Sequence, residues 1–350
     1  MLPPIRLVFA HLEQFMHALV LTLATVGFAA AEPDPQMKAV LDAHAALDPK
    51  PIETLTPAEA RKQPTLGDAV KAVLTKQGKP TAPEEVGKVA DLSIPAAPPI
   101  PARVYTPTGA GPFPVLVYWH GGGWVLADLN TYDSSCRALC NAANCVVVSC
   151  GYRHAPEHPF PAAVDDALTA YAWVCKNAAT LNGDPKRVAV AGESAGGNLA
   201  AVVTHHCRGT NPGLPAPVHQ VLVYPVTDSN MDTPSYRENA DAKPLNKAMM
   251  GWFFGHYVPD ARQRTDTRVA LLRAADLKGL PPATVILAEI DPLRSDGEQY
   301  AAKLQAAGVR VNLKSYPGVA HEFFGMGAVV DKAKEAVGVA AADLKAAFGK

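Results

Sequence analysis

Hydrophobic positions follow two alternating patterns along most of the chain. Short runs that are apolar on both faces recur, and PVLVYW at 114–119 is the clearest of them. Such runs are typical of central strands in a parallel sheet, because helices cover both faces of that sheet. Further strands are predicted at 88–94, 102–105, 145–149, 187–191, 220–224, 283–289 and 309–315.

Helical spacing of apolar residues separates many of these strands. It predicts helices at 161–181, 195–207, 297–307 and 331–348, so strands and helices alternate after residue 114. This alternation indicates the α/β class, with a doubly wound, mostly parallel sheet covered by helices on both faces. Helical spacing also marks the segment from Asp34 to about Gln77, ahead of the sheet.

One stretch departs from the alternation. Residues 229–278 have no strand pattern but hold several bulky side chains: Met249, Met250, Trp252, Phe253, Phe254 and Tyr257. A packed helical excursion is one interpretation; a lid over the strand ends is the other, and the bulky aromatic side chains favour it. We predict a catalytic domain at 86–228 and 279–350, N-terminal cap helices at 32–85 and a cap insertion at 229–278.

The first 31 residues differ from the rest. Residues 18–31 (ALVLTLATVGFAAA) are apolar and end in Ala29-x-Ala31, a spacing typical of signal-peptide cleavage. The run is too short to span a bilayer. A cleaved signal, a non-native extension and an amphipathic helix are all compatible with it. A signal would place the protein in the periplasm or outside the cell; otherwise the cytoplasm is expected.

Composition excludes several classes of function. The chain has 350 residues and a net charge of −1, so no basic surface is available for nucleic acid. The cysteines form no CxxC pair and have no histidine pair at zinc spacing, so we expect small buried side chains and no metal site. A disulfide would require export; a homodimer is left open. The cysteines are Cys136, Cys140, Cys145, Cys150, Cys175 and Cys207.

A serine among small residues follows the predicted strand at 187–191. In GESAGG, Gly192, Ser194 and Gly196 form the GxSxG pattern, in which a strand turns directly into a helix and exposes the serine hydroxyl. The helix that begins at Ala195 directs free N–H groups toward that hydroxyl, where they can stabilise negative charge. For this motif alone, a passive serine in a tight turn is the alternative.

A second glycine motif, HGGGW at 120–124, follows the strand at 114–119. Acyl transfer develops an oxyanion, and residues without side chains allow a substrate carbonyl to approach backbone N–H donors. We expect His120 to brace this loop, and His154 and His158 to be structural.

A serine nucleophile also needs a base, and the base needs an orienting acid. Among eleven histidines, His321 follows the last predicted strand and a Pro317-Gly318 turn. Asp291 ends the strand before it, and Asp296 lies nearby; we choose Asp291 because it is at the strand end. The order Ser194, Asp291, His321 is that of an α/β-hydrolase triad.

Five motifs together resemble those of the hormone-sensitive-lipase family of α/β-hydrolases (bacterial family IV): HGGGW, YRHAPEHPFPAAVDDA, GESAGG, DPLRSDG and VAHEFF. The resemblance runs from about Asp34 to the C-terminus. It implies the α/β-hydrolase fold with a helical cap, and an esterase that acts on small-molecule esters without a cofactor.

The same resemblance assigns roles to residues of this chain. Ser194 is expected as the nucleophile, His321 as the base and Asp291 as its orienting acid. The backbone N–H groups of Gly122, Gly123 and Ala195 are expected to form the oxyanion hole.

Three positions depart from the family pattern. Glu193 stands where aspartate is usual, His154 where an apolar residue is usual, and Glu322 where glycine is usual. None of these removes a catalytic group. Glu193 and Glu322 can shift the pKa of His321 or steer substrate charge.

The leading hypothesis is a serine carboxylesterase that cleaves short- to medium-chain acyl esters through an acyl-enzyme. We expect Trp124, Trp252 and Phe253 to line the substrate pocket and to limit acyl length. The same triad can cleave a lactone, an amide or a thioester, which the sequence does not separate. A non-catalytic receptor on this fold is disfavoured, because His321 and the other triad members are present.

Overall fold

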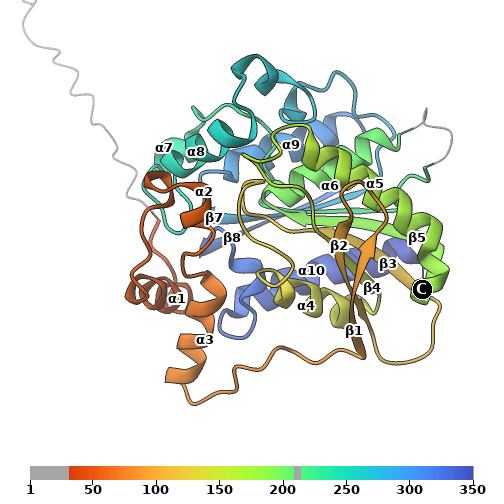
Figure 1. Cartoon of the computed structure of the whole chain (residues 1–350), viewed down its shortest axis with the longest axis horizontal. Helices are drawn as coiled ribbons and strands as arrows, with labels where there is room; N and C mark the ends of the chain where they lie inside the picture. The colour runs from red at the N-terminus through yellow and green to blue at the C-terminus, as the bar shows by residue number, and fades with distance from the viewer. Residues whose placement is uncertain (1–30, 209–213, 350) are drawn as a thin grey trace, which may run out of the picture.

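An eight-stranded sheet lies at the centre of the computed structural model, which describes residues 31–208 and 214–349 (Figure 1). The proposed signal segment at 1–31 lies almost wholly outside the described residues. The strand order is β1-β2-β4-β3-β5-β6-β7-β8; the β1–β2 and β2–β4 pairs are antiparallel and the others parallel. The strands are β1 (Lys88–Ile94), β2 (Ile100–Thr106), β3 (Phe113–Trp119), β4 (Val146–Cys150), β5 (Gly183–Glu193), β6 (Gln220–Val223), β7 (Ala283–Ile290) and β8 (Val311–Ala320).

Helices cover both faces of this sheet, which confirms the predicted doubly wound arrangement (Figure 1). Strand β3 shows why the sequence folds in this way. Val115 and Val117 pack into the core on one face, while Leu116 and Tyr118 pack into the core on the other. The first core is shared with α5 (Ala162–Asn177), α6 (Ala195–His206) and α9 (Arg294–Ala306), and the second with α4 (Asp133–Ala143) and α10 (Asp331–Phe348).

The segment before the sheet forms three helices whose starts are encoded locally. Asp34 caps α1 (Pro35–Ala46) by accepting the N–H of Met37 at 2.8 Å. Capping boxes begin α2 (Pro57–Ala60) and α3 (Leu66–Lys76). A side-chain oxygen that accepts an N–H of the first turn satisfies a donor that has no partner within the helix.

Residues 229–278 contain α7 (Pro234–Glu238), α8 (Lys247–Tyr257) and short 3₁₀ turns, with no strand, as the sequence predicts. Figure 1 shows α2 next to α7 and α8 at one end of the sheet. The two segments are in direct contact, because the Trp252 indole N–H donates to Leu55 O at 3.2 Å. The division into cap and catalytic parts stays a prediction.

The last strand differs from its prediction. β8 continues to Ala320, so Pro317 and Gly318 lie within it and not in a turn before His321. The pairing with β7 shifts register between Ala288 and Ile290. At this irregularity Gly318 has φ +68°, and its N–H donates to the Glu289 carboxylate at 2.7 Å. A glycine bulge of this kind admits turn-like residues into a strand without ending it.

All six cysteines are buried and free, which confirms their interpretation as small core side chains. Burial raises the pKa of the Cys145 and Cys150 thiols, so both stay protonated. Within residues 31–208 and 214–349, no helix is long and apolar enough to cross a membrane.

The β5–α6 turn generates a test of packing. A Cβ at Gly196 would overlap the backbone oxygen of Trp119. Gly196→Ala is therefore expected to lower the free energy of unfolding by about 1–3 kcal/mol, measured by urea denaturation. Gly338 lies exposed in α10 with open space around it, so Gly338→Ala is the control and should raise stability by up to about 1 kcal/mol. Equal effects of the two substitutions would contradict the close approach.

Candidate active site

Ser194 occupies the turn between β5 and α6 in a conformation that side chains rarely adopt. Its φ is 56° and its ψ is −117°. Such backbone strain costs about 1–3 kcal/mol and persists only where the surroundings enforce it. Here the Ser194 N–H donates to Val223 O at 2.9 Å, and Ser194 O accepts the N–H groups of Asn198 and Val226 at 3.1 and 3.2 Å. These bonds hold the serine at the carboxyl ends of the central strands.

His321 follows β8 and pairs with Asp291, which follows β7. The distance from His321 Nδ1 to Asp291 Oδ2 is 2.7 Å, and both side chains are buried. The other oxygen of Asp291 accepts the N–H of Leu293 at 2.8 Å. Asp291 therefore orients the imidazole through Nδ1, while His321 and Ser194 line the same cavity.

Asp296, the alternative acid, has different partners. Its Oδ2 accepts the N–H groups of Thr227 and Asp228 at 3.0 and 3.1 Å. Burial raises the pKa of the Asp296 carboxyl to about 8, because no nearby positive charge offsets the loss of water. The structure thus brings Asp291, and not Asp296, to His321.

The charge state of His321 depends on opposing effects. Burial of the imidazole lowers its pKa, but the charge and the hydrogen bond of Asp291 raise it. Glu322 and Glu193 add negative charge and raise it further, so the pKa of His321 lies above its ordinary value. Of the two departures from the family pattern, Glu322 adds a carboxylate where glycine is usual and so favours the imidazolium, whereas Glu193 keeps the charge type of the usual aspartate.

The glycine motif lies across the cavity from the helix α6. Gly122 and Gly123 line the cavity with φ of 93° and 58°, in the region that favours glycine. A Cβ at Gly122 would overlap Leu126 O, and one at Gly123 would overlap the Phe253 ring. Ala195 is the first residue of α6, so its N–H has no acceptor within the helix. The assignment of these three N–H groups to an oxyanion hole stays a prediction.

His120 braces the glycine loop from below, as predicted. Its Nδ1 lies 2.8 Å from Gly121 O, and its ring stacks on Tyr152 at 4.5 Å between centroids. The Tyr152 hydroxyl donates to the carbonyls of His120 and Gly121, both at 3.0 Å. Burial lowers the pKa of His120 to about 4, so this support is uncharged.

Glu193, the residue before Ser194, is buried and accepts hydrogen bonds from two tyrosines. The sequence analysis did not predict the tyrosines. Tyr118 donates to Glu193 Oε1 at 2.6 Å, and Tyr224 donates to Oε2. Burial raises the pKa of Glu193 despite these hydrogen bonds. The Tyr224 ring lies 4.4 Å from the His321 ring, so Glu193 supports the histidine through Tyr224. The available signal was a tyrosine near the end of each neighbouring strand, in PVLVYW and QVLVY.

Glu322 lines the cavity in a left-handed conformation with φ 66°. Its carboxylate accepts the Tyr132 hydroxyl at 3.3 Å. The glycine that is usual here would adopt this φ without strain. The substitution therefore adds a carboxylate to the cavity wall at some conformational cost.

The cavity around Ser194 has a volume of about 380 Å³. One part of its wall is apolar and comes largely from α8 and the segment before it: Val226, Leu245, Met249, Met250 and Phe253. Another part is polar and includes His44, Arg61, Gln63, Thr65, Asp128 and Glu322. No group of three or more His, Cys, Asp or Glu among the described residues could hold a metal ion.

Two of the three aromatic residues expected in the pocket do not line it. Trp124 is fully buried, has a φ of 59° and stacks on Tyr257 at 4.2 Å between ring centroids, so its indole packs in the core. Trp252 turns toward Leu55, while its neighbour Phe253 faces the cavity. Adjacent helical residues point about 100° apart, and here the contact of Trp252 with Leu55 leaves Phe253 as the one of these two that faces the cavity.

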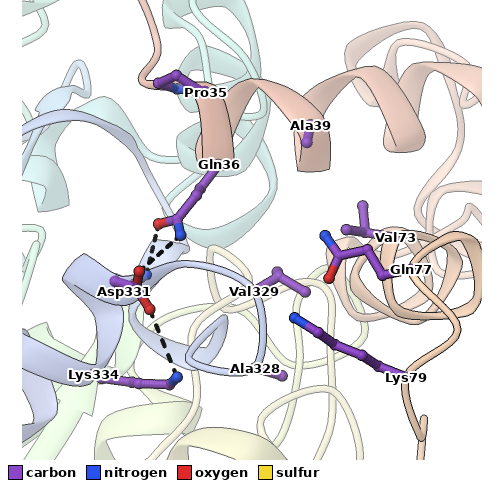
Figure 2. Close-up of a pocket in the computed structure, with 10 residues that line it drawn as sticks. All are labelled: Pro35, Gln36, Ala39, Val73, Gln77, Lys79, Ala328, Val329, Asp331 and Lys334. Atoms are coloured by element: carbon purple, nitrogen blue, oxygen red, sulfur yellow. Dashed lines mark hydrogen bonds and ion pairs between the residues drawn. The ribbon is translucent and has the colours of Figure 1, made fainter.

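A second, exposed pocket lies away from the serine, between α1, α3 and the start of α10 (Figure 2). Its volume is about 310 Å³. Gln36 and Asp331 exchange two hydrogen bonds there, at 2.8 and 2.9 Å, and Lys334 approaches Asp331 at 3.7 Å. These contacts join α1 to α10, so Gln36, Asp331 and Lys334 have a structural role here.

Known proteins share this arrangement. A model of the α/β-hydrolase fold matches residues 116–325. The carboxylesterase NlhH of Mycobacterium tuberculosis is 47% identical over 253 residues, which cover 71% of this chain and 79% of the relative. The crystal structure of a thermostable esterase from Pseudomonas putida ECU1011 matches with a TM-score of 0.81 at 36% identity, covering 92% of this chain and 99% of that one.

The chain belongs to the hormone-sensitive-lipase family of α/β-hydrolases. It is a carboxylesterase. An ethyl acetate hydrolase of Pseudomonas putida is 36% identical over 290 residues, or 81% of this chain and 88% of that one. Fold, family and enzyme class therefore agree with the resemblance read from the sequence motifs.

The raised pKa of Asp296 gives a test in solution. In the unfolded chain an aspartate titrates near its ordinary pKa of about 4, whereas folded Asp296 keeps its proton to about pH 8. Wild-type stability is therefore expected to fall as pH rises through this window. Asp296→Asn, which cannot ionise, should gain Tm relative to wild type between about pH 5 and about pH 9. Parallel Tm curves across that range would show that Asp296 is ionised in the folded protein.

Proposed function

We propose that this carboxylesterase hydrolyses short- to medium-chain acyl esters through an acyl-enzyme on Ser194. His321 takes the hydroxyl proton as Ser194 Oγ attacks the ester carbonyl. The N–H groups of Gly122, Gly123 and Ala195 then stabilise the oxyanion. The observation that carries the proposal is the 2.7 Å pair of His321 and Asp291 beside a cavity that also holds the strained serine.

Loss of the alcohol completes acylation, and water then removes the acyl group from Ser194. The C–O bond to the alcohol breaks, and His321 gives its proton to the leaving alkoxide. In deacylation, His321 takes a proton from water as the water oxygen attacks the acyl carbonyl. The bond between the acyl carbon and Ser194 Oγ then breaks as His321 gives that proton to Oγ, which releases the acid and restores Ser194. Asp291 holds the ring through Nδ1 and stabilises the imidazolium.

The apolar wall supports a limit on acyl length. Each methylene that leaves water gains about 0.8 kcal/mol until the chain meets a wall. Phe253 and Met250 close the cavity above the glycine loop, which favours short chains over palmitate. The relative from Pseudomonas putida named as an ethyl acetate hydrolase is consistent with a small acyl group.

The nucleophile and its acid can be tested together with p-nitrophenyl butyrate. Ser194→Ala should lose kcat by on the order of 10⁴ or more while remaining folded. Asp291→Asn should lose about 10³- to 10⁴-fold, because the wrong tautomer of His321 is then favoured. Asp296→Asn is the matched control and should retain most activity. A larger loss from Asp296→Asn than from Asp291→Asn would contradict the assignment of the acid.

Acyl specificity provides a further test, with p-nitrophenyl esters of graded length. For wild type, kcat/KM should rise from acetate to butyrate or hexanoate and fall beyond octanoate. Phe253→Ala should move this limit to longer chains, because it removes the ring above Gly123. Trp252→Ala should leave the optimum in place, because that indole faces Leu55. A wild-type preference for palmitate would show that α8 does not limit the acyl site.

A further inference from the structure

Arg61 connects the N-terminal helices to the loop that carries the glycine motif. It caps the C-terminus of α2, and its side chain lines the cavity that holds Ser194. Its Nε donates to Val125 O at 2.8 Å and its Nη2 donates to Ala155 O at 2.8 Å. The guanidinium also forms a fork with the Glu157 carboxylate, with two distances of 2.7 Å.

Both carbonyls belong to segments that fix the glycine motif. The Val125 N–H donates to Gly122 O at 3.0 Å, and the Ala155 N–H donates to Trp124 O at 2.9 Å. Arg61 therefore binds a short hydrogen-bonded network that includes Gly122 and Trp124, the residues on either side of Gly123. His120 and Tyr152 support the same loop from its inner side.

This loop needs an external support. Gly122, Gly123 and Trp124 all have positive φ, and the glycines have no side chains with which to anchor the backbone. The oxyanion interaction depends on N–H groups that are already aimed before the reaction, and loss of one such donor costs about 10²- to 10³-fold in kcat. A small displacement of the loop is therefore expected to reduce kcat more than substrate binding.

We propose that Arg61 is a positioning residue for the oxyanion hole, so that docking of the N-terminal segment sets the geometry of the glycine loop. The inference rests on the proposed function of Gly122 and Gly123. An arginine suits this position because its planar fork reaches two carbonyls and a carboxylate at once. A lysine presents one point charge and cannot bond all three groups in this geometry.

Glu157 provides the matched control. It is the partly exposed partner of the ion pair, and it contacts Arg61 on the side away from Val125. Glu157→Gln removes the charge pair but leaves Arg61 able to donate to both carbonyls. Exposed ion pairs contribute little to stability. Because both carbonyl bonds of Arg61 also remain, this variant should keep wild-type kcat.

The experiment compares Arg61→Met, Arg61→Lys and Glu157→Gln with p-nitrophenyl butyrate. Arg61→Met should lose about 10- to 100-fold in kcat with KM changed little. A trifluoromethyl ketone, whose tetrahedral adduct on Ser194 carries the oxyanion, should bind more weakly by a similar factor, whereas butyrate should inhibit as in wild type. Arg61→Lys should recover only part of the loss. Thermal melts verify that each variant is folded; if Arg61→Met is not, Arg61→Lys carries the test.

Three outcomes would overturn the proposal. Wild-type kcat and ketone affinity in the arginine variants would show that the loop needs no support from Arg61. A rise in KM without a fall in kcat would indicate substrate contact, and an equal loss in Glu157→Gln would assign the effect to the ion pair. Failure of the proposed function is distinguishable, because Ser194→Ala would then stay active and the ketone would not inhibit wild type.

Discussion

The whole site depends on the turn that takes β5 into α6 at a single residue. Ser194 accepts a strained backbone there because Val223 and Val226 bond its N–H and C=O groups. The turn is tight only if Gly192 and Gly196 have no side chains, since a Cβ on either would overlap neighbouring backbone. The same geometry directs the first N–H of α6 toward the cavity. In the proposed mechanism, the positions of the nucleophile and of one oxyanion donor are thus two results of one backbone constraint.

Acidic side chains around this turn have distinct roles because of their partners. Asp291 pairs with a histidine and accepts a backbone N–H, whereas Asp296 accepts two backbone N–H groups and faces no cation. Glu193 is held by two phenols and reaches His321 only through the Tyr224 ring. Burial alone raises the pKa of a carboxyl, and a nearby positive or polar group opposes that rise. Position at the strand end distinguishes Asp291 from Asp296, but the protonation behaviour of each acid follows from its local partners.

Much of the fold and the site was predictable, because the deciding signals are local in sequence. Apolar runs mark the parallel strands, and Ser194, Asp291 and His321 each follow a strand, so the topology brings them together. The failures concern orientation set by tertiary packing. Which of Trp252 and Phe253 faces the cavity depends on how α8 docks against Leu55. The extension of β8 through Gly318 depends on the hydrogen bond that the Gly318 N–H donates to the Glu289 carboxylate. Neither contact has a signature in the residues next to it.

The neutral support of the glycine loop has a consequence for the electric field at the reacting carbonyl. Burial lowers the pKa of His120 to about 4 and that of His154 to about 3, so both rings are uncharged over the whole neutral range. The field that the loop applies therefore comes from fixed peptide dipoles, and neither histidine changes it within that range. Acidification acts on the imidazole of His321 and leaves the electrophilic side of the site unaltered. In the proposed mechanism, the histidine whose protonation changes is thus the proton acceptor, and it is separate from the groups that polarise the substrate.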